Sequence, residues 1–593
     1  MTDRRFSAPD LARRLLAPIA ALLGLVAGLS VLILPSPAPT TADPTTFSAE
    51  RAMASINRLA DEPHSVLRRE AHDRARDDVV GMFTDLGYTA NVHSDPLFDF
   101  SIPEDKETFD MLSTEQQAAV KDATADTIVV DVPGKSERTM ALMAHYDSAT
   151  VEGTENDEQS YSSGTSHGAA DDGYGVAAII ETLRAIKAEG RQPENSLKIV
   201  ITDGEEIGLV GARNEMRHHR ADYDNVDLFL NLEARGMSGP AFMFETSPNN
   251  SAVAGYFLSH VKQPVTGSLL PSLYARMPNT TDMAKVIPEG FTVLNIAAIG
   301  EADHYHHATD APRYVNHSTL QHYGDQVLDL TRAWAFDGQA PTLTANGDLH
   351  FFQLWRGMTV SYPATVGTGL GCLAIIAALG VVVVRARSLR WKRVLGTVWG
   401  LTWRAASVSA AAGLVQLGAM AMKWAPETGI GPNPLLPWMF AGGALIGAGL
   451  TAHFVVRRWK EGLGQETLAA VLLLLAAACV PLIVLLPGAA YVLVLPTLTL
   501  ALTALAPQRV RPVVGALAAF IMVVIFAPTV LLIHELLSLS AVWVTVFFAI
   551  VPVAPLALVL LQAGSRRTAR GAGTASGAAH NSTPVVGQVA ATV

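Results

Sequence analysis

Cysteine is almost absent from this chain of 593 residues. Only Cys372 and Cys479 occur, and both lie inside long apolar runs. The rest of the chain therefore contains no disulfide, and cysteine gives no information about its compartment. Acidic residues are also scarce after residue 360, where four acids accompany fifteen Lys and Arg. The two halves of the chain therefore differ in charge.

The acids missing from the second half are concentrated in residues 36–360. This segment holds 48 acidic and 24 basic residues, a formal charge of −24. Such a surface repels the phosphates of nucleic acids and of anionic lipids, so we expect no nucleic-acid partner. The chain is also too long for one compact domain. We expect a soluble, acidic domain over 36–350 within a membrane protein.

Long apolar runs flank the acidic segment on both sides. A bilayer core of about 30 Å needs about 20 apolar residues per helix. By this criterion we expect about eight transmembrane helices, one before the acidic domain and about seven in an all-α membrane domain over 361–562, with the bilayer as partner. The expected spans are 15–35, 361–384, 401–422, 435–456, 467–486, 489–507, 513–533 and 541–562.

Basic residues precede the first span and follow every second one. The positive-inside rule places such loops in the cytoplasm. We therefore expect residues 1–14 and a disordered tail over 563–593 to be cytoplasmic, and the acidic domain to lie outside the cell membrane. The first span is either a retained anchor or a cleaved signal peptide. Its length and the Pro-rich linker after it favour the anchor.

Apolar strand patterns alternate with helical patterns in the acidic segment. This alternation predicts an α/β domain, a mixed sheet with helices on both faces. Functional sites in such sheets lie beyond the carboxyl ends of strands. The expected strands are 127–132, 141–146, 197–202, 226–232, 241–246 and 291–299, and the expected helices are 175–188, 208–219 and about 251–262.

Metal-ligand residue types lie at the ends of these apolar runs. Zinc binds His nitrogens and carboxylate oxygens. Two metals about 3.5–4 Å apart that share a carboxylate can activate water. Two His and four carboxylates suit such a pair with a general base, which makes a hydrolase the first hypothesis. The six candidates are His145, Asp171, Glu205, Glu206, Glu233 and His306.

Each candidate also has a simpler interpretation. His145 shares a strand face with Asp147, whose carboxylate can hold the imidazole tautomer, although a lone His at a strand end is more often a surface residue. Asp171 of the GAADDGYG motif is either a ligand or the cap of the helix that starts near Gly173. The adjacent acids of GEEIGL are either a ligand and a general base, or two solvated acids.

The remaining two candidates leave similar alternatives. Glu233 ends a wholly apolar strand, where an unpaired carboxylate is costly, so a metal or Arg235 must compensate it. The HYHHATD cluster contains three His that cannot all bind a two-metal site of this kind. Five further histidines of the segment are expected at the surface, namely His167, His218, His219, His317 and His322.

In this order, the motifs HYDS, GAADDGYG, GEEIGLVGA, NLE and YHHATD resemble those of co-catalytic di-zinc aminopeptidases, in metallopeptidase clan MH. That clan also includes glutaminyl cyclase. NLEARGMSGPAFMFETSPNN and the arrangement of spans are similar to the membrane-bound branch, the endoplasmic-reticulum metallopeptidases and fungal vacuolar membrane proteases. The motif similarity covers about residues 50–330.

The resemblance implies two zinc ions per chain and assigns their ligands. His145 and Glu233 would bind one zinc ion, and Asp171 would bridge the two. Glu206 and His306 would complete the second site. His306 is preferred to its neighbour His307 because the family pattern is Y-H-x-x-x-D.

The resemblance also implies an activity. Glu205 would be the general base, and Asp147 would support the catalytic centre. The expected function is zinc-dependent exopeptidase hydrolysis of peptide substrates, of the aminopeptidase type. The alternatives are a single-zinc glutaminyl cyclase, a non-catalytic receptor or transporter with a peptidase-like domain, and an activity of the membrane half itself.

Overall fold

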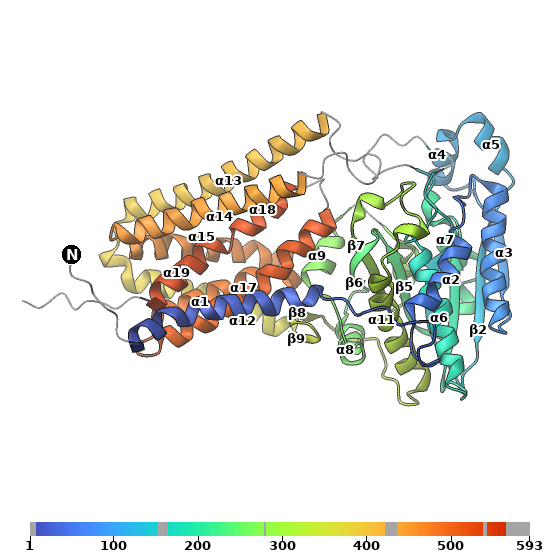
Figure 1. Cartoon of the computed structure of the whole chain (residues 1–593), viewed down its shortest axis with the longest axis horizontal. Helices are drawn as coiled ribbons and strands as arrows, with labels where there is room; N and C mark the ends of the chain where they lie inside the picture. The colour runs from blue at the N-terminus through green and yellow to red at the C-terminus, as the bar shows by residue number, and fades with distance from the viewer. Residues whose placement is uncertain are drawn as a thin grey trace, which may run out of the picture.

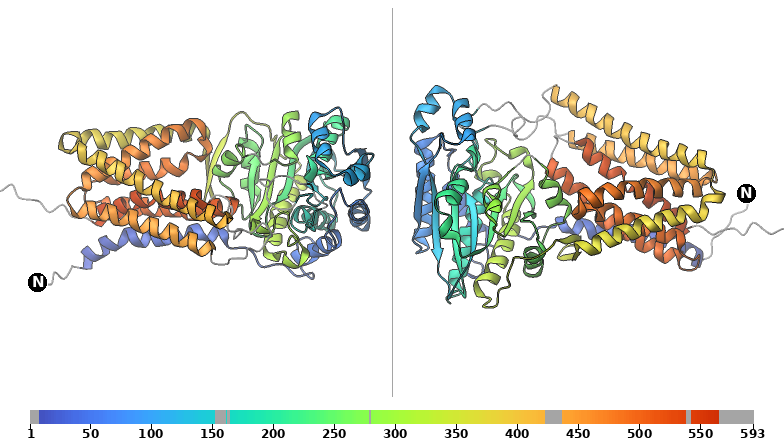
Figure 2. Two further views of the ribbon diagram at one scale, coloured as in Figure 1. Left: turned by 90° about the horizontal axis from the view of Figure 1, so that it is seen from above. Right: turned by 180° about the vertical axis from the view of Figure 1, so that it is seen from behind.

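The structure is a computed structural model that describes residues 8–151, 161, 164–277, 280–421, 436–537 and 542–564. A bundle of long helices and an α/β domain lie end to end along the longest axis of the molecule (Figure 1). Two further views show the same arrangement (Figure 2). The predicted tail beyond residue 564 and the first seven residues lie outside the described residues.

The α/β domain contains a seven-stranded mixed sheet of order β1-β2-β4-β3-β5-β7-β6. Strands β4, β3, β5 and β7 are parallel, whereas β1, β2 and β6 pair antiparallel with their neighbours. All six predicted strands are present, and β1 was not predicted. The strands are β1 (Asn91–Pro96), β2 (Thr124–Val132), β3 (Ser136–His145), β4 (Asn195–Thr202), β5 (Val226–Ala234), β6 (Ser238–Thr246) and β7 (Val293–Gly300).

Helices cover both faces of the sheet, as predicted. Strand β3 shows why, since Leu142 packs in the core cluster under one set of helices and its neighbour Met143 packs in the cluster on the other face. A strand segment buried on both faces is continuously apolar, as residues 140–144 of β3 are. Helices α2 (Ala49–Leu59), α6 (Gly173–Ala188), α8 (Ser251–His260) and α11 (His317–Phe336) cover one face, and α7 (Val210–His218) and α10 (Met283–Val286) cover the other.

Smaller elements complete the domain. A hairpin of β8 and β9, which was not predicted, leads directly into the helix bundle. Helix α9 packs against the short helix η8 of the bundle. The elements are α3 (Arg69–Asp85), α4 (Pro103–Met111), α5 (Thr114–Val120), α9 (Leu269–Tyr274), β8 (Leu349–Trp355), β9 (Met358–Pro363) and η8 (Pro487–Ala489).

The helical part is confirmed, whereas the number of about eight spans stays a prediction. Within the described residues, five helices are long and apolar enough to cross a membrane, over 12–32, 364–388, 464–485, 511–534 and 543–564. Helix α16 is too short to be among the five. Helices α13 and α14 are also not among them, and they carry Arg404 and Arg457 among other polar residues. The helices are α1 (Ala8–Leu29), α12 (Ala364–Arg385), α13 (Trp391–Ala421), α14 (Leu436–Lys460), α15 (Gly464–Leu485), α16 (Tyr491–Leu505), α17 (Arg511–Leu537), α18 (Val542–Ile550) and α19 (Val553–Gly564).

Helix α1 packs closely along α17. A Cβ added at Gly24 would lie 2.8 Å from the carbonyl oxygen of Phe520, and one at Gly28 would lie 2.9 Å from that of Val524. Small residues four apart let two helix backbones approach in this way. At the end of α1, Ser30 accepts a hydrogen bond from the backbone N–H of Arg356, between β8 and β9. The first apolar helix is thus packed into the bundle and bonded to the hairpin.

Candidate metal centre

The candidate residues gather at the carboxyl edge of the four parallel strands. His145 is the last residue of β3, and Glu233 is the penultimate residue of β5. Glu205 and Glu206 begin the short helix η2 (Glu205–Ile207) after β4. Asp171 precedes α6, and His306 follows the short helix η5 (Ala302–His304) after β7. Parallel strands place all their carboxyl ends at one edge, which brings together residues up to 161 positions apart in the chain.

Asp171 lies between the two histidines. Its Oδ1 is 3.2 Å from Nε2 of His145, and its Oδ2 is 3.3 Å from Nε2 of His306. All three side chains are buried. Each carboxylate oxygen therefore faces a different imidazole, which is the arrangement that a carboxylate bridging two metals requires.

Two sets of three ligand atoms share Asp171. Its carboxylate, His145 and Glu233 form one set, and its carboxylate, Glu206 and His306 form the other. In each set the ligand atoms lie within 4.8 Å of one another. Ligand atoms on one zinc are about 3.4 Å apart in a tetrahedron with bonds of about 2.0–2.2 Å. Both sets can therefore hold a zinc ion after small side-chain movements.

Several polar atoms of this cluster lack hydrogen bonds. Oε1 of Glu206 and Nδ1 of His306 are buried without a hydrogen-bond partner, and Nε2 of His306 has only ion-pair contacts, at 3.1 Å to Glu206 and 3.3 Å to Asp171. Burial lowers the pKa of His306, but Glu206 and Asp171 outweigh burial and raise that pKa to about 10. Burial raises the pKa of Glu206 to about 7. Buried polar atoms without partners are costly, and a bound cation would satisfy them.

Glu233 and Glu205 add to the buried negative charge. Burial raises the pKa of both carboxyls well above their usual range, and the charge of Glu233 further raises the pKa of Glu205. Among the ion pairs of the described residues, none joins Arg235 to Glu233, and the Arg235 guanidinium lies over the ring of Tyr305 at 5.6 Å instead. The geometry therefore favours a metal ion over Arg235 as the cation that compensates Glu233.

Asp147 has a different contact from the expected one. Nδ1 of His145 is 3.0 Å from the backbone carbonyl oxygen of Asp147 and 3.5 Å from its carboxylate. The carboxylate accepts hydrogen bonds from the backbone N–H groups of Glu205 at 3.1 Å and Glu206 at 3.2 Å. Asp147, which is fully buried, therefore positions the two glutamates as well as the imidazole.

Asp310 holds the loop that carries Asp171. Its carboxylate accepts hydrogen bonds from the N–H of Ala170 at 2.7 Å and from the hydroxyl of Ser166 at 3.0 Å. Burial and the charge of Asp171 raise the pKa of Asp310 to about 7. Within the motif that contains Asp310, His306 faces the carboxylates, and His307 is in neither set of ligand atoms.

Near the site, the structure excludes one alternative interpretation and corrects one expectation. Asp172, not Asp171, caps helix α6, because its carboxylate accepts a hydrogen bond from the N–H of Gly175 at 3.0 Å. His322 is buried, where Nδ1 accepts from the N–H of Ala241 at 3.1 Å, so it is not a surface residue.

Asp282 is the main residue near the site that sequence reasoning missed. It is buried, its Oδ2 accepts a hydrogen bond from the hydroxyl of Thr202, and its Oδ1 has no partner. Burial raises its pKa to about 6. Asp282 lies in the polar segment TTDMAK, which shows no strand end or motif, and only the fold brings it near His145 and Glu205.

A cavity opens beside the carboxylates. Asp171, Glu205 and Glu233 lie at one side of it, and most of the remaining wall is apolar. The remaining lining residues are Ala234, Arg235, Phe242, Phe244, Leu270, Tyr274, Met277, Thr280, Thr281, Ala297, Ile299 and Tyr305. The arrangement can hold a polar reacting group at the acids and an apolar side chain in the remainder.

Part of this domain is similar in sequence to known proteins. Residues 127–331 match the family model of peptidase family M28. The chain is 29% identical over 210 residues to a vacuolar membrane protease of Lodderomyces elongisporus, covering 35% of this chain and 20% of that protein. It is 23% identical over 219 residues to endoplasmic reticulum metallopeptidase 1 of Mus musculus, covering 36% and 24%. The chain thus spans about a quarter or less of the length of these relatives.

Solved structures are also similar to part of this chain. A Zn-dependent exopeptidase from Parabacteroides distasonis is 17% identical, with 48% of this chain and 98% of that chain covered and a TM-score of 0.35. A glutaminyl cyclase from Porphyromonas gingivalis is 18% identical, with the same coverages and a TM-score of 0.37.

Proposed function

We propose that residues 127–331, which match the family model of peptidase family M28, form a zinc-peptidase domain of that family, and that the protein is a membrane-anchored exopeptidase of the aminopeptidase type that uses two zinc ions. One observation carries the proposal. Asp171 divides its two oxygens between His145 and His306, and a further carboxylate completes each set of ligands. The unsatisfied buried atoms of Glu206 and His306 fit bound cations.

The ligands would divide as the two sets indicate. His145 and Glu233 would hold one zinc ion, Glu206 and His306 the other, and Asp171 both. When bound, zinc supplies Lewis acidity, which lowers the pKa of water towards about 7 and polarises a carbonyl group.

Glu205 is the residue left to move protons. It lines the cavity, and it belongs to neither set of ligands that shares Asp171. We assign it as the general base, which takes a proton from the attacking water and delivers it to the leaving amine. Its hydrogen-bonded backbone, held by Asp147, fixes the direction from which the carboxylate reaches the cavity.

Replacing Asp147 by asparagine tests this positioning role. The amide nitrogen would face a backbone N–H of Glu205 or Glu206, where the carboxylate now accepts from both. Loss of a residue that orients metal ligands typically costs 10–100-fold, so we expect a loss of about that size in zinc affinity or kcat/KM. Zinc titration of the chelated full chain with an activity readout measures it, and wild-type behaviour of Asp147→Asn would contradict the role.

The cavity supports a preference for large apolar side chains. Phe242 and Phe244 lie in its wall, and the Phe244 ring meets that of Tyr274 edge-on at 4.7 Å. Burial of an apolar side chain there removes its surface from water. We propose that the substrate residue next to the scissile bond occupies this cavity.

Shortening Phe244 to alanine should weaken that preference. Because a single methylene group in an apolar pocket is worth about 10–200-fold in specificity, we expect kcat/KM for Leu or Phe substrates to fall by about 10-fold or more relative to Ala substrates. Competition between the two substrates measures the ratio, with the exposed Phe100→Ala as control. If the ratio of the two kcat/KM values did not change, the substrate side chain would not bind against Phe244.

The helix bundle supports one wall of this cavity. Helix α9 carries Leu270 and Tyr274 into the lining and packs on η8. Leu532 of α17 packs against the apolar cluster that contains Phe242 and Phe244. We propose that one role of the later helices is to shape the substrate cavity, and that this side of the domain faces the membrane.

The orientation is also part of the proposal. The basic loops after alternate apolar helices support a topology with both termini in the cytoplasm and the peptidase domain on the other side of the cell membrane. The close packing of α1 on α17 supports its retention as an anchor, with the peptidase domain over 36–350, the helical domain over 361–562 and about eight spans in all.

Peptide products test the direction of cleavage. The full chain in detergent is incubated with one peptide whose amino terminus is free and with the same peptide acetylated. An aminopeptidase releases single amino-terminal residues from the free peptide only. Release from the carboxyl end of both would contradict the aminopeptidase assignment, and cyclisation of an amino-terminal Gln would favour a glutaminyl cyclase.

A further inference from the structure

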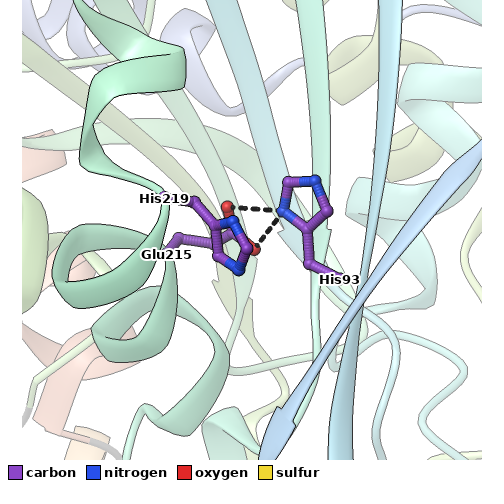
Figure 3. A group of neighbouring side chains, drawn as sticks. All are labelled: His93, Glu215 and His219. Carbon is purple, nitrogen blue, oxygen red and sulfur yellow. Dashed lines mark hydrogen bonds and ion pairs between the residues drawn. The ribbon is translucent and has the colours of Figure 1, made fainter.

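A second group of metal-ligand side chains lies away from the catalytic cluster. His93 is on β1, and Glu215 and His219 are on and directly after helix α7 (Figure 3). Strand β1 is at the edge of the sheet opposite β6, and α9, which packs against β6, also packs on the helix bundle. We propose that His93, Glu215 and His219 bind one further zinc ion, or a similar first-row transition metal, that ties the edge strand β1 to α7.

The local structures present these residues together. Glu215 and His219 are four apart on α7 and its C-terminal cap, so they lie on one face of the helix. His93 and Asp95 are two apart on β1, so they lie on one face of the strand. The two faces meet, because His93 of β1 contacts Glu215 of α7 and Asp95 of β1 contacts His219.

The distances suit one metal ion. Nδ1 of His93 lies 3.0 and 3.1 Å from the two oxygens of Glu215, and Figure 3 shows these contacts as dashed lines. The ligand atoms of the three residues all lie within 4.8 Å of one another. Ligands on a tetrahedral zinc are about 3.4 Å apart, so His93 and Glu215 need to separate by a few tenths of an ångström.

Neighbouring groups orient two of the ligands. Nε2 of His219 is 3.0 Å from a carboxylate oxygen of Asp95, a carboxylate–histidine pair of the kind that holds metal-binding imidazoles in place. Nδ1 of His219 makes no hydrogen bond within the described part of the chain, and it is the atom that we assign to the metal. The hydroxyl of Tyr223 donates to Oε2 of Glu215 at 2.6 Å.

Burial and charge also favour a metal over two separate ion pairs. The Glu215 side chain is fully buried, whereas the rings of His93 and His219 are 20% and 28% exposed, which leaves a path for entry and for a water as fourth ligand. The rings are stacked with centroids 4.0 Å apart. One divalent ion at this position would offset the charges of two carboxylates, those of Glu215 and Asp95.

Metal content tests this site in the full chain, purified in detergent after expression with zinc. We expect His93→Gln/His219→Gln to contain one zinc per chain fewer than the wild-type protein by mass spectrometry, with peptide hydrolysis within twofold of wild type. The exposed His218→Gln, on the same helix, is the matched control and keeps the wild-type zinc content. The difference between variants does not depend on how many zinc ions the catalytic cluster holds.

Equal zinc content in the double variant and the wild type would overturn the proposal and leave His93 and His219 as partners in ion pairs. If the double variant does not fold, anomalous diffraction from wild-type crystals at the zinc edge decides. A peak within bonding distance of His93 Nδ1 and Glu215 supports the site, and the absence of such a peak overturns it.

Discussion

Replacing Glu205 by glutamine is expected to lower kcat for peptide hydrolysis by about 10²–10⁴-fold, while the zinc content stays at the wild-type value. Glutamine keeps the size of the side chain but cannot accept the proton of the attacking water. The hydrogen bond from the Glu205 backbone to Asp147 does not involve the altered group, so the position of the residue should be preserved. Steady-state kinetics and metal analysis of the same preparation measure both quantities.

The control is Glu115→Gln, the same change at an exposed residue of α5, which should leave kcat unchanged. If Glu205→Gln retained wild-type turnover, another group would have to move the proton. If it lost zinc as well as activity, Glu205 would be a ligand rather than the base. His145, Glu205 and Glu206 do form a further set of possible ligand atoms, so metal analysis separates the two roles.

Replacing Asp171 by asparagine is expected to remove most of both catalytic zinc ions. Its two oxygens face His145 and His306 at 3.2 and 3.3 Å, and an amide cannot offer both metals an anionic oxygen. Mutation of a residue that only orients a ligand typically lowers metal affinity 10–100-fold. The loss of a shared ligand should therefore lower zinc affinity by more than about 100-fold. Zinc content should fall by up to two per chain, and hydrolysis should fall with it.

Asp224→Asn, at an exposed residue, is the matched control for this change. Loss of a single zinc with retained hydrolysis would contradict a shared bridging carboxylate. A wild-type zinc content would show that Asp171 is not a ligand. The same experiment separates the catalytic centre from the proposed site at His93, because Asp171→Asn should leave that metal bound.

Most of the central sheet was predictable because its strands are buried on both faces. Runs such as those around Leu142 and Leu230 are wholly apolar, and polar or glycine-rich segments mark their ends. Strand β1 was not predictable in this way, since an edge strand with the sequence NVHSDP shows neither an apolar run nor alternation. Length and hydropathy identified the apolar helices, of which five in the described part of the chain are long and apolar enough to cross a membrane.

The candidate ligands were predictable from their places at strand ends, whereas their partners were not. Asp282 reaches the site from a segment that shows no strand end, and the role of Asp310, which the Y-H-x-x-x-D pattern includes, depends on contacts across the fold. The contact of Asp147 with two backbone N–H groups depends on how the chain turns after β4. The cluster at His93 was missed because His219 was assigned to the surface and β1 was not recognised.

The central claim is that this domain hydrolyses peptides with bound zinc, and one measurement tests it directly. The full chain in detergent is treated with a chelator, dialysed and titrated with zinc while the release of single amino acids from a peptide library is followed. We predict that the chelator abolishes release and that zinc restores it. Fully zinc-loaded, folded protein that releases no amino acid from any peptide would contradict the account.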